Sequence, residues 1–327
     1  MITEFAFDTH FFDSKSLNTA GQSAAHDSIL SMWRDHGVLV SNTDKIEKFL
    51  DLIKKLPIKY QQRWKDALEY YRISLVDNNW EEFGDYENFS KLKSLCSIFK
   101  TALADDEISK ILSESEDSTM RCSTTGFELL GAGAVSESIN FQSCRTEGRT
   151  EISFGSTAQA IWSTKILPLA KYSKNITIID RYLYTRIRNS LPRKSEVSGA
   201  LGFLRLLSDS GKKFNVTIIS GGEEKGSTAF HEITDYFDAN IAKCPPLAKA
   251  LNSLTLISNH DHFFRDYAHE RFIRFDSHVC EIGVGMQIFE SHPSPMTSFS
   301  LKHSSETLFQ ERETMSSKNI LWRKFII

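Results

Sequence analysis

The sequence lacks the features that would place it in a membrane or cross-link it covalently. No apolar run approaches the roughly 18 residues of a membrane-spanning helix. The five cysteines, at positions 96, 122, 144, 244 and 280, are scattered and never arranged as Cys-x-x-Cys. This usage is typical of a reducing compartment and argues against a disulfide framework or a zinc knuckle. Ordinary hydrophobic (40%) and charged (25%) fractions exclude a disordered, collagen-like or coiled-coil chain.

The amino terminus and the charge distribution carry further information. The segment MITEFAFD is acidic where a secretory signal would be basic, so we expect a cytoplasmic protein without a transmembrane segment. Residues 1–150 carry 17 Lys and Arg against 24 Asp and Glu, whereas residues 151–327 carry 22 against 18. The mildly basic second half is therefore expected to bind any polyanion, with chance as the alternative explanation of the asymmetry.

The length and the order of periodic segments predict two α/β domains. Residues 1–118 are expected to form a helix-rich α/β domain, residues 119–150 a β-rich connection, and residues 151–327 a layered α/β domain. In the first domain we expect strands at 2–7 and 37–41 and helices at 16–35, 43–57, 59–75 and 89–112. In the connection, the residue patterns of GFELLGAGAV and SINFQS predict strands.

One segment of the second half combines residue types that bind phosphate. It is His269-Glu-Arg271-Phe-Ile-Arg-Phe-Asp276, with Gly283 seven residues after the aspartate. Side chains alternate between the faces of a strand, so His269 and Arg271 are expected to point the same way. Arginine offers phosphate oxygens a planar fork of donors, and histidine can act as nucleophile or general acid. Asp276 would orient the imidazole and Arg274 would add a phosphate contact; a packed histidine and solvent-facing arginines are the alternatives.

This spacing resembles the phospholipase D superfamily motif HxKx4D followed by glycine, with Arg271 in place of the lysine. The Ser and Asn that follow in that superfamily are replaced here by Val284 and Met286. The segments IIDRYL (178–183), GALGFLRLL (199–207) and SFSLKHSSET (298–307) surround the motif. Their order is similar to that of the C-terminal phospholipase-D-like domain of MIT-domain proteins, so residues 150–327 resemble that domain.

The resemblance implies two different activities. The superfamily hydrolyses phosphodiesters through a phosphohistidine without a cofactor, and a chain with a single motif needs a homodimer to complete the site. The eukaryotic MIT-domain relatives carry the same arginine and are regarded as non-catalytic, dimeric, phosphoinositide-binding adaptors. The residues implied in catalysis are His269, Arg271, Asp276 and Glu306, and those implied in substrate binding are Asp180, Arg181 and Arg274.

Acidic residues near the ends of the predicted strands form a second candidate site. Asp8 follows the first strand, Glu47 lies on the helix after the second, and Asp105 and Asp106 lie on a later helix. Carboxylates at the carboxyl ends of strands lie where open α/β sheets bind ligands, and such a set could hold Mg²⁺ or Mn²⁺ and activate water. The order resembles that of PIN-like nucleases over residues 1–115, with His10 at the position of that family's asparagine. An α/β scaffold with ordinary surface acids is the alternative.

These observations predict a phosphodiesterase or nuclease that acts on nucleic acid through a homodimeric phospholipase-D-like site. We would expect such a protein in a microbial defence system, where it would act with a partner protein from the same system. Two alternatives remain open. One is a non-catalytic dimerisation and binding module for a partner protein or an anionic lipid. The other is a metal-dependent PIN-like nuclease that uses the N-terminal acids.

Overall fold

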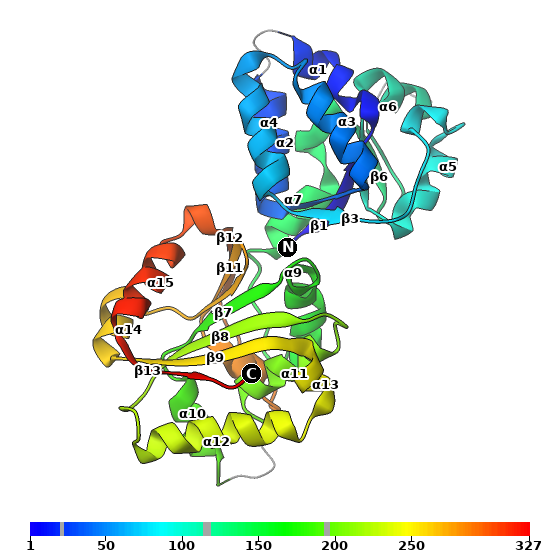
Figure 1. The fold of residues 1–327 in the computed structure, drawn as a ribbon. Helices are drawn as coiled ribbons and strands as arrows, with labels where there is room; N and C mark the ends of the chain where they lie inside the picture. Colours follow the sequence, from blue (N-terminus) through cyan, green and yellow to red (C-terminus); the bar gives the residue numbers. More distant parts are fainter. Residues whose placement is uncertain (20–22, 114–118, 193–196) are drawn as a thin grey trace. The chain divides into compact units, whose positions relative to one another are not determined.

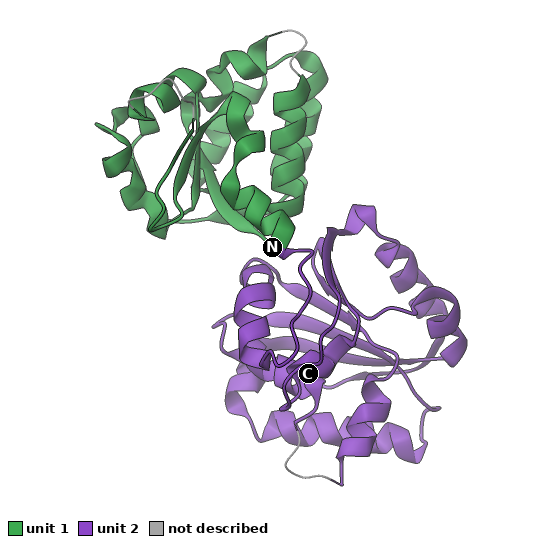
Figure 2. Cartoon of the chain, turned by 180° about the vertical axis from the view of Figure 1, so that it is seen from behind, with its two compact units in different colours: residues 1–146 green, residues 147–327 purple. Residues whose placement is uncertain are grey.

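The chain folds into two compact α/β units. The structure, a computed structural model, describes residues 1–19, 23–113, 119–192 and 197–327. Met1–Thr146 form the first unit and Glu147–Ile327 the second (Figure 2). Each unit contains one mixed sheet with helices packed on it (Figure 1), which confirms the predicted α/β class. Within the described part of the chain, no helix combines the length and the apolar character needed to cross a membrane.

The first unit is built on a six-stranded sheet of order β3-β2-β1-β4-β6-β5. The strands from β3 to β6 in this order are parallel, and the edge strand β5 pairs antiparallel with β6. The central strands are short runs of buried residues, as expected for parallel strands covered on both faces. The strands are β1 (Thr3–Phe7), β2 (Gly37–Ser41), β3 (Ile73–Leu75), β4 (Thr101–Ala104), β5 (Thr119–Arg121) and β6 (Glu128–Gly131).

Helices cover both faces of this sheet. On one face, Trp33 of α2 and Trp64 of α4 pack with their rings edge-on against Phe5 and Phe7 of β1. On the other face, α5, α6 and the segments around them close a second apolar cluster. The helices are α1 (Lys15–Asn18), α2 (Ser23–His36), α3 (Thr43–Ile53), α4 (Ile58–Tyr70), α5 (Phe89–Leu92), α6 (Asp106–Ser113) and α7 (Ile139–Glu147). Short 3₁₀ segments are η1 (Thr9–Asp13), η2 (Phe83–Asp85), η3 (Lys93–Ser97) and η4 (Ala132–Glu137).

The second unit is built on a seven-stranded sheet of order β12-β11-β10-β7-β8-β9-β13. The central strands β7, β8 and β9 are parallel, and the outer strands pair antiparallel. The strands are β7 (Asn175–Ile179), β8 (Phe214–Gly221), β9 (Leu251–Asn259), β10 (Phe272–Phe275), β11 (His278–Ile282), β12 (Phe299–His303) and β13 (Ile320–Phe325).

The two faces of the second sheet are covered differently. On one face, Phe203 of α11 contacts Phe275 of β10 and Phe289 of η6. On the other, α14 and α15 pack on the carboxyl halves of β7, β8 and β9. The helices are α8 (Ala158–Ile161), α9 (Leu167–Lys171), α10 (Leu183–Ser190), α11 (Gly199–Ser208), α12 (Thr228–Ala242), α13 (Pro245–Ala250), α14 (Asp261–Tyr267) and α15 (Phe309–Lys318). A π-helical turn, η5 (Trp162–Ile166), joins α8 to α9, and η6 (Gly285–Phe289) and η7 (Ser304–Glu306) are 3₁₀ segments.

Some elements differ from those expected. Residues 101–104 form the strand β4 inside a region expected to be one helix from 89 to 112. Leu and Ala favour helices, but all four residues are buried between β1 and β6, where pairing on both sides outweighs intrinsic preference. Residues 73–75 likewise form β3 rather than the end of a helix. The segment SINFQS starts the helix α7, because Ser138 Oγ accepts a hydrogen bond from Phe141 N (3.1 Å).

The division between the units falls later than the expected end of the first domain. The boundary expected at residue 118 adjoins residues 114–118, which lie outside the described part. Residues 119–146, expected to belong to a connection, contribute β5, β6 and α7 to the first unit. The β5–β6 hairpin extends the first sheet, so its hydrogen bonds tie this segment to the first unit.

Candidate functional site

A buried carboxylate stands at the carboxyl end of β7, the central parallel strand that pairs with β10 and β8. Asp180 follows Ile179 directly and is fully buried. Its oxygens accept hydrogen bonds from the backbone N–H groups of Tyr182 (3.1 Å) and Met286 (3.0 Å). Asp180 therefore ties the end of β7 to the loop that follows β11.

Arg271 lies beside this carboxylate, immediately before β10. Its Nε lies 4.0 Å from Asp180 Oδ1, and its Nη1 donates a hydrogen bond to the carbonyl oxygen of Gly283. The same Nε is buried and has no hydrogen-bond partner among the described residues. Most buried polar groups are hydrogen-bonded, so this unpaired buried donor calls for an explanation.

Gly285 makes this close packing possible. It adopts a φ of +62°, and a Cβ atom built there would lie 2.2 Å from Asp180 Oδ2 and 2.8 Å from Arg271 Cδ. Both the backbone conformation and the lack of space require glycine. The loop is thus shaped around the aspartate and the arginine.

An exposed aromatic ring lies among the cations of this cluster. Tyr182 is 41% exposed, and the guanidinium carbons of Arg181 and Arg271 lie 5.3 Å and 5.4 Å from its ring centroid. Arg181 also forms a two-pronged ion pair with Asp261, with N–O distances of 2.9 Å and 2.7 Å. Both guanidinium groups therefore lie within the distance at which a cation is attracted to an aromatic ring.

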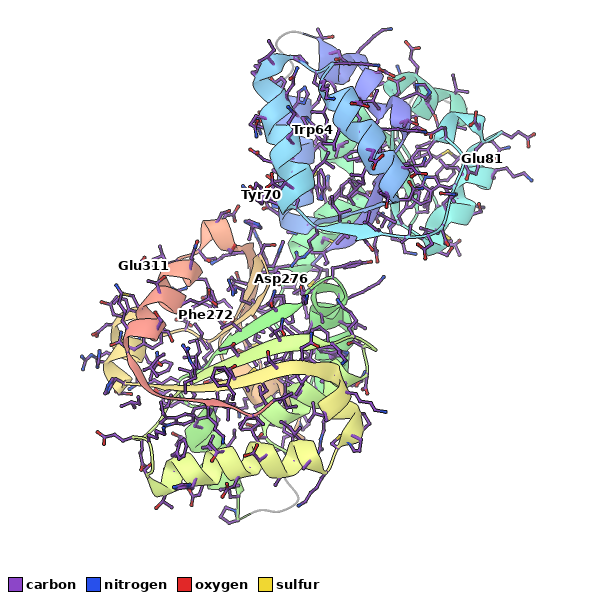
Figure 3. The ribbon with its side chains drawn as sticks, viewed as in Figure 1. Trp64, Tyr70, Glu81, Phe272, Asp276 and Glu311 are labelled. Atoms are coloured by element: carbon purple, nitrogen blue, oxygen red, sulfur yellow. The ribbon has the colours of Figure 1, made fainter. Side chains whose placement is uncertain are left out.

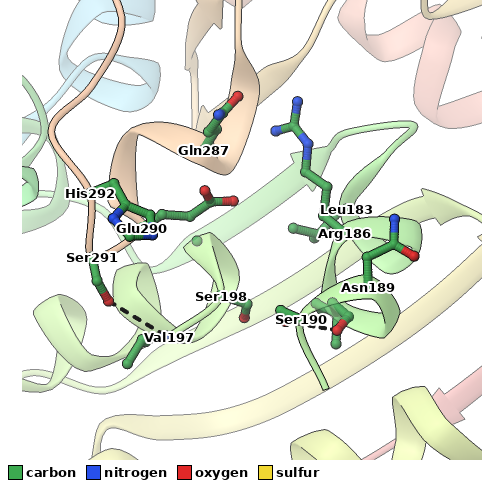
Figure 4. Close-up of a pocket in the computed structure, with 12 residues that line it drawn as sticks. Leu183, Arg186, Asn189, Ser190, Val197, Ser198, Gln287, Glu290, Ser291 and His292 are labelled. Carbon is green, nitrogen blue, oxygen red and sulfur yellow. Dashed lines mark hydrogen bonds between the residues drawn. The ribbon is translucent and has the colours of Figure 1, made fainter. Parts of the chain in front are cut away.

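Arg186 adds a further positive charge from α10. Its Nη1 donates a hydrogen bond to the carbonyl oxygen of Val284 (3.2 Å), in the same loop that receives Arg271. Arg186 also lines a cavity of about 230 Å³ between α10, α11 and η6, and Figure 4 shows it together with Gln287 and Glu290. We call Arg181, Tyr182, Arg186 and Arg271 the arginine–tyrosine cluster.

The structure separates His269 from Asp276. β10 begins at Phe272, so His269 lies in an exposed loop before the strand, and alternation along a strand does not set its direction. Phe272 starts β10 and Asp276 follows its end (Figure 3). The four residues of β10, with a rise of about 3.3 Å each, span about 13 Å and separate the segments that carry His269 and Asp276. Among the described residues, no hydrogen bond or ion pair joins Asp276 to His269, so the structure does not bring together the pair that was expected to meet.

Asp276 has a structural role instead. It adopts a left-handed conformation (φ 48°) in the turn between β10 and β11. Its carboxylate accepts hydrogen bonds from the backbone N–H groups of Lys174 (2.8 Å) and Asn175 (3.1 Å). The turn is thereby fixed to the start of β7.

The remaining residues implied by the phospholipase-D-like motif lie in other places. Arg274 points to α15, where its Nη2 lies 2.8 Å from Glu313 Oε1. Glu306 belongs to η7 and lines a cavity of about 220 Å³ together with Lys302 and Arg312. Asp180, Arg181 and Arg271 are thus brought together, whereas Arg274 and Glu306 lie in other parts of the second unit, against α15 and in η7.

In the first unit, Asp8 is buried at the carboxyl end of β1. It accepts hydrogen bonds from the backbone N–H groups of His10 (2.8 Å) and Phe83 (2.5 Å). Burial raises the pKa of Asp8 although these bonds oppose the shift. Glu47 is exposed on α3, and the inward-facing residue of that turn is Lys45, which pairs with Glu82 at 3.1 Å. Sequence reasoning missed Lys45 and Glu82 because neither belongs to a recognisable motif.

The carboxylates of Asp105 and Asp106 also accept hydrogen bonds from other groups of the protein. Asp105 Oδ1 accepts a hydrogen bond from the Glu107 N–H group at the start of α6 (2.8 Å). Asp106 accepts hydrogen bonds from the hydroxyls of Ser14 and Ser16 (2.6 Å each), and from a backbone N–H group. Burial raises the pKa of Asp106, but these hydrogen bonds outweigh it and the net shift is downward. Among the described residues, no three His, Cys, Asp or Glu side chains form a group that could hold a metal ion.

Comparison with known proteins gives little further information. No protein-family model matches the sequence, and no curated protein matches it. Among solved structures, the chain is similar to one described as that of TrmBL2, an archaeal chromatin protein with a novel mode of DNA binding. The match has 13% identity and a TM-score of 0.25, and covers 53% of this chain and about half (54%) of that one. A TM-score this low supports no inference about function.

Proposed function

We propose that the second unit binds the phosphodiester backbone of single-stranded nucleic acid at the arginine–tyrosine cluster. The observation that carries the proposal is the exposed Tyr182 ring with the guanidinium groups of Arg181 and Arg271 near it. Bases of single strands stack on exposed aromatic rings, and Arg186, which forms no ion pair with any described carboxylate, adds the positive charge that phosphates require. The excess of cationic residues in the second half of the chain agrees with this preference for a polyanion.

Binding is supported better than cleavage. The guanidinium groups of Arg186 and Arg271 donate hydrogen bonds to backbone carbonyl oxygens, and that of Arg181 pairs with a carboxylate. These bonds fix the side chains in one orientation, as in a preformed binding surface. The histidine lacks the aspartate that was expected to orient it. Arginine–phosphate contacts require only the positive groups, whereas phosphohistidine chemistry requires an imidazole in a defined orientation.

Cleavage by His269 is the second candidate, and one observation favours it. The Asp266 carboxyl group has a lowered pKa, mainly because Arg265 donates a hydrogen bond to it; His262 and, last, His269 contribute smaller effects, which places Asp266 in the neighbourhood of His269. Asp266 could therefore take the orienting role that Asp276 does not have. His269 would attack phosphorus and displace one alkoxide, and water would then hydrolyse the phosphohistidine.

The binding test uses the full chain and a fluorescein-labelled single-stranded 20-mer of DNA or RNA, measured by fluorescence anisotropy. We expect Tyr182→Ala to weaken binding by about tenfold or more, in line with the loss of one stacked base. Tyr182→Phe keeps the ring and should bind like the wild type. Arg186→Gln should weaken binding and flatten its salt dependence, whereas Arg205→Gln, at an exposed position of α11, is the matched control.

The same experiment separates the alternatives. Wild-type affinity in both Tyr182→Ala and Arg186→Gln would refute the proposed surface. Cleavage that survives EDTA and disappears in His269→Ala would establish the histidine mechanism, and cleavage that requires Mg²⁺ or Mn²⁺ would point to Asp8 and its neighbours. Binding to phosphoinositide vesicles without binding to nucleic acid would support the adaptor function.

A further inference from the structure

The second sheet has a polar, partly open face that the proposed function does not use. In β7, β8 and β9, the odd-numbered residues point to the side of α14 and α15. Their carboxyl halves contribute Ile179, Ile219 and Ile257 to an apolar cluster beneath these helices. The amino halves of the same strands are polar. A central parallel sheet is normally covered by apolar contacts on both faces, so this polar half requires an explanation.

A row of threonines crosses the polar half. Thr177, Thr217 and Thr255 lie directly opposite one another on β7, β8 and β9. Arg274 of β10 continues the row at one end, and Phe325 of β13 continues it at the other. The hydroxyl groups of Thr217 and Thr255 make no hydrogen bond to any residue that the structure describes, so they remain available to a ligand.

A second row consists of side chains that are hydrogen-bonded to one another. Asp276 accepts a hydrogen bond from Asn175 Nδ2 (2.9 Å), and Asn175 Oδ1 accepts one from Asn215 Nδ2 (2.9 Å). Ser253 Oγ then donates to Asn215 Oδ1 (3.3 Å). This chain of hydrogen bonds runs from the β10–β11 turn across three strands, and it holds the polar groups in one orientation.

These rows form part of the lining of a cavity of about 430 Å³, and α15 provides one wall through Glu313, Ser316 and Ser317. The volume falls in the range of small-molecule sites. Arg274 pairs with Glu313 inside the cavity at 2.8 Å, while its Nε is buried without a hydrogen-bond partner among the described residues. Burial raises the pKa of Glu313, and the nearby Arg274 opposes this shift.

The cavity also contains a positive charge that no carboxylate balances. Arg323 of β13 lines the cavity, is exposed, and forms no ion pair with any carboxylate in the described ranges. Arg274 is neutralised by Glu313, so the balance of charge at the open end is positive. A ligand that fits must offer hydroxyl groups to the threonines and a negative group to Arg323.

We propose that this cavity binds a sugar-sized, hydroxylated molecule that carries one phosphate or carboxylate group. The hydroxyls of the ligand bond to Thr217, Thr255 and the fixed amide groups, and its anionic group pairs with Arg323. The site is separate from the arginine–tyrosine cluster and does not depend on nucleic-acid binding.

Isothermal titration of the full chain with defined probes tests the proposal. We expect ribose 5-phosphate or glucuronate to bind saturably with one site per chain, and uncharged ribose and inorganic phosphate to bind at least tenfold more weakly. Preference for one of the two anions identifies the charged group. Thr217→Val, which keeps the shape and removes the hydroxyl, should weaken binding about fivefold, the effect of one hydrogen bond. Arg323→Gln should weaken it about tenfold or more.

Two controls make the outcome decisive. Lys324→Gln changes the neighbouring residue of β13, which alternation places on the opposite face, and should bind like the wild type. Tyr182→Ala should also leave this binding unchanged. Failure of both anionic probes to bind at millimolar concentration would overturn the proposal. Equal binding of phosphate alone, or wild-type affinity in Thr217→Val and Arg323→Gln, would overturn it as well.

Discussion

Replacing Asp180 tests whether a buried carboxylate holds the binding loop in place. Its oxygens accept hydrogen bonds from the Tyr182 and Met286 N–H groups, and its side chain is buried. Asp180→Asn keeps one acceptor and turns the other into a donor that faces an N–H group. A hydrogen bond to a charged group contributes about 1.5–3 kcal/mol. We therefore expect the free energy of unfolding of the second unit to fall by about 2 kcal/mol, and by about twice as much for Asp180→Ala.

Hydrogen exchange measured by mass spectrometry on the full chain is the suitable assay, because it reports on each unit separately. A loss of 2 kcal/mol should accelerate exchange about 30-fold in peptides that cover residues 178–186 and 283–289. Peptides of the first unit should not change. Asp235→Asn, at an exposed position of α12, is the matched control. If both Asp180 variants exchange at wild-type rates in these peptides, the carboxylate does not hold the loop and the reasoning fails.

Two further predictions concern stability. Gly202→Ala would place a Cβ atom 2.1 Å from the backbone oxygen of Phe289, so we expect about 1–3 kcal/mol of destabilisation in urea unfolding. Gly84→Ala is the control and should be near neutral, because its Cβ atom would lie 3.6 Å from the nearest atom. Equal unfolding midpoints for the two variants would contradict this prediction. Burial lowers the pKa of His36 to about 4, so the unfolded chain binds a proton below pH 6.5 that the folded chain does not. Stability should therefore fall between pH 6.5 and 4, by up to about 1.4 kcal/mol per pH unit, and an unchanged profile in His36→Gln would contradict this assignment.

Strands and helices with strong patterns could be predicted, and short buried ones could not. GVLVS was expected as a strand over 37–41 and forms β2 with these bounds. The helix expected from residue 43 begins there as α3, and Asn42 caps it by accepting a hydrogen bond from Lys45 N. β4 was missed because its four buried residues show no alternation of polar and apolar side chains. Their preference for a helix is outweighed by pairing with strands that are distant in the sequence.

The candidate site could be predicted only in part, because motif spacing does not specify where a strand begins. Asp180, Arg181 and Arg271 were expected near one another and are brought together by the pairing of β7 with β10. His269 was expected on the strand, but the strand begins after Arg271. Arg186 was missed because its contact, the Val284 carbonyl oxygen, lies 98 residues away in the sequence. No local pattern encodes such a contact.

The geometry also shows what Arg271 does at the position where the phospholipase D motif, which the sequence resembles, has lysine. Arg271 makes three contacts in different directions: Nη1 to the Gly283 oxygen, Nε toward Asp180, and the guanidinium plane over Tyr182. A lysine ammonium is a single point of charge and has no plane to place over a ring, so it could not make all three at once. Arg271 therefore joins β7, the loop after β11 and the exposed ring into one surface. A residue fixed in this way is suited to holding a phosphate in place, which agrees with the binding function proposed for the cluster.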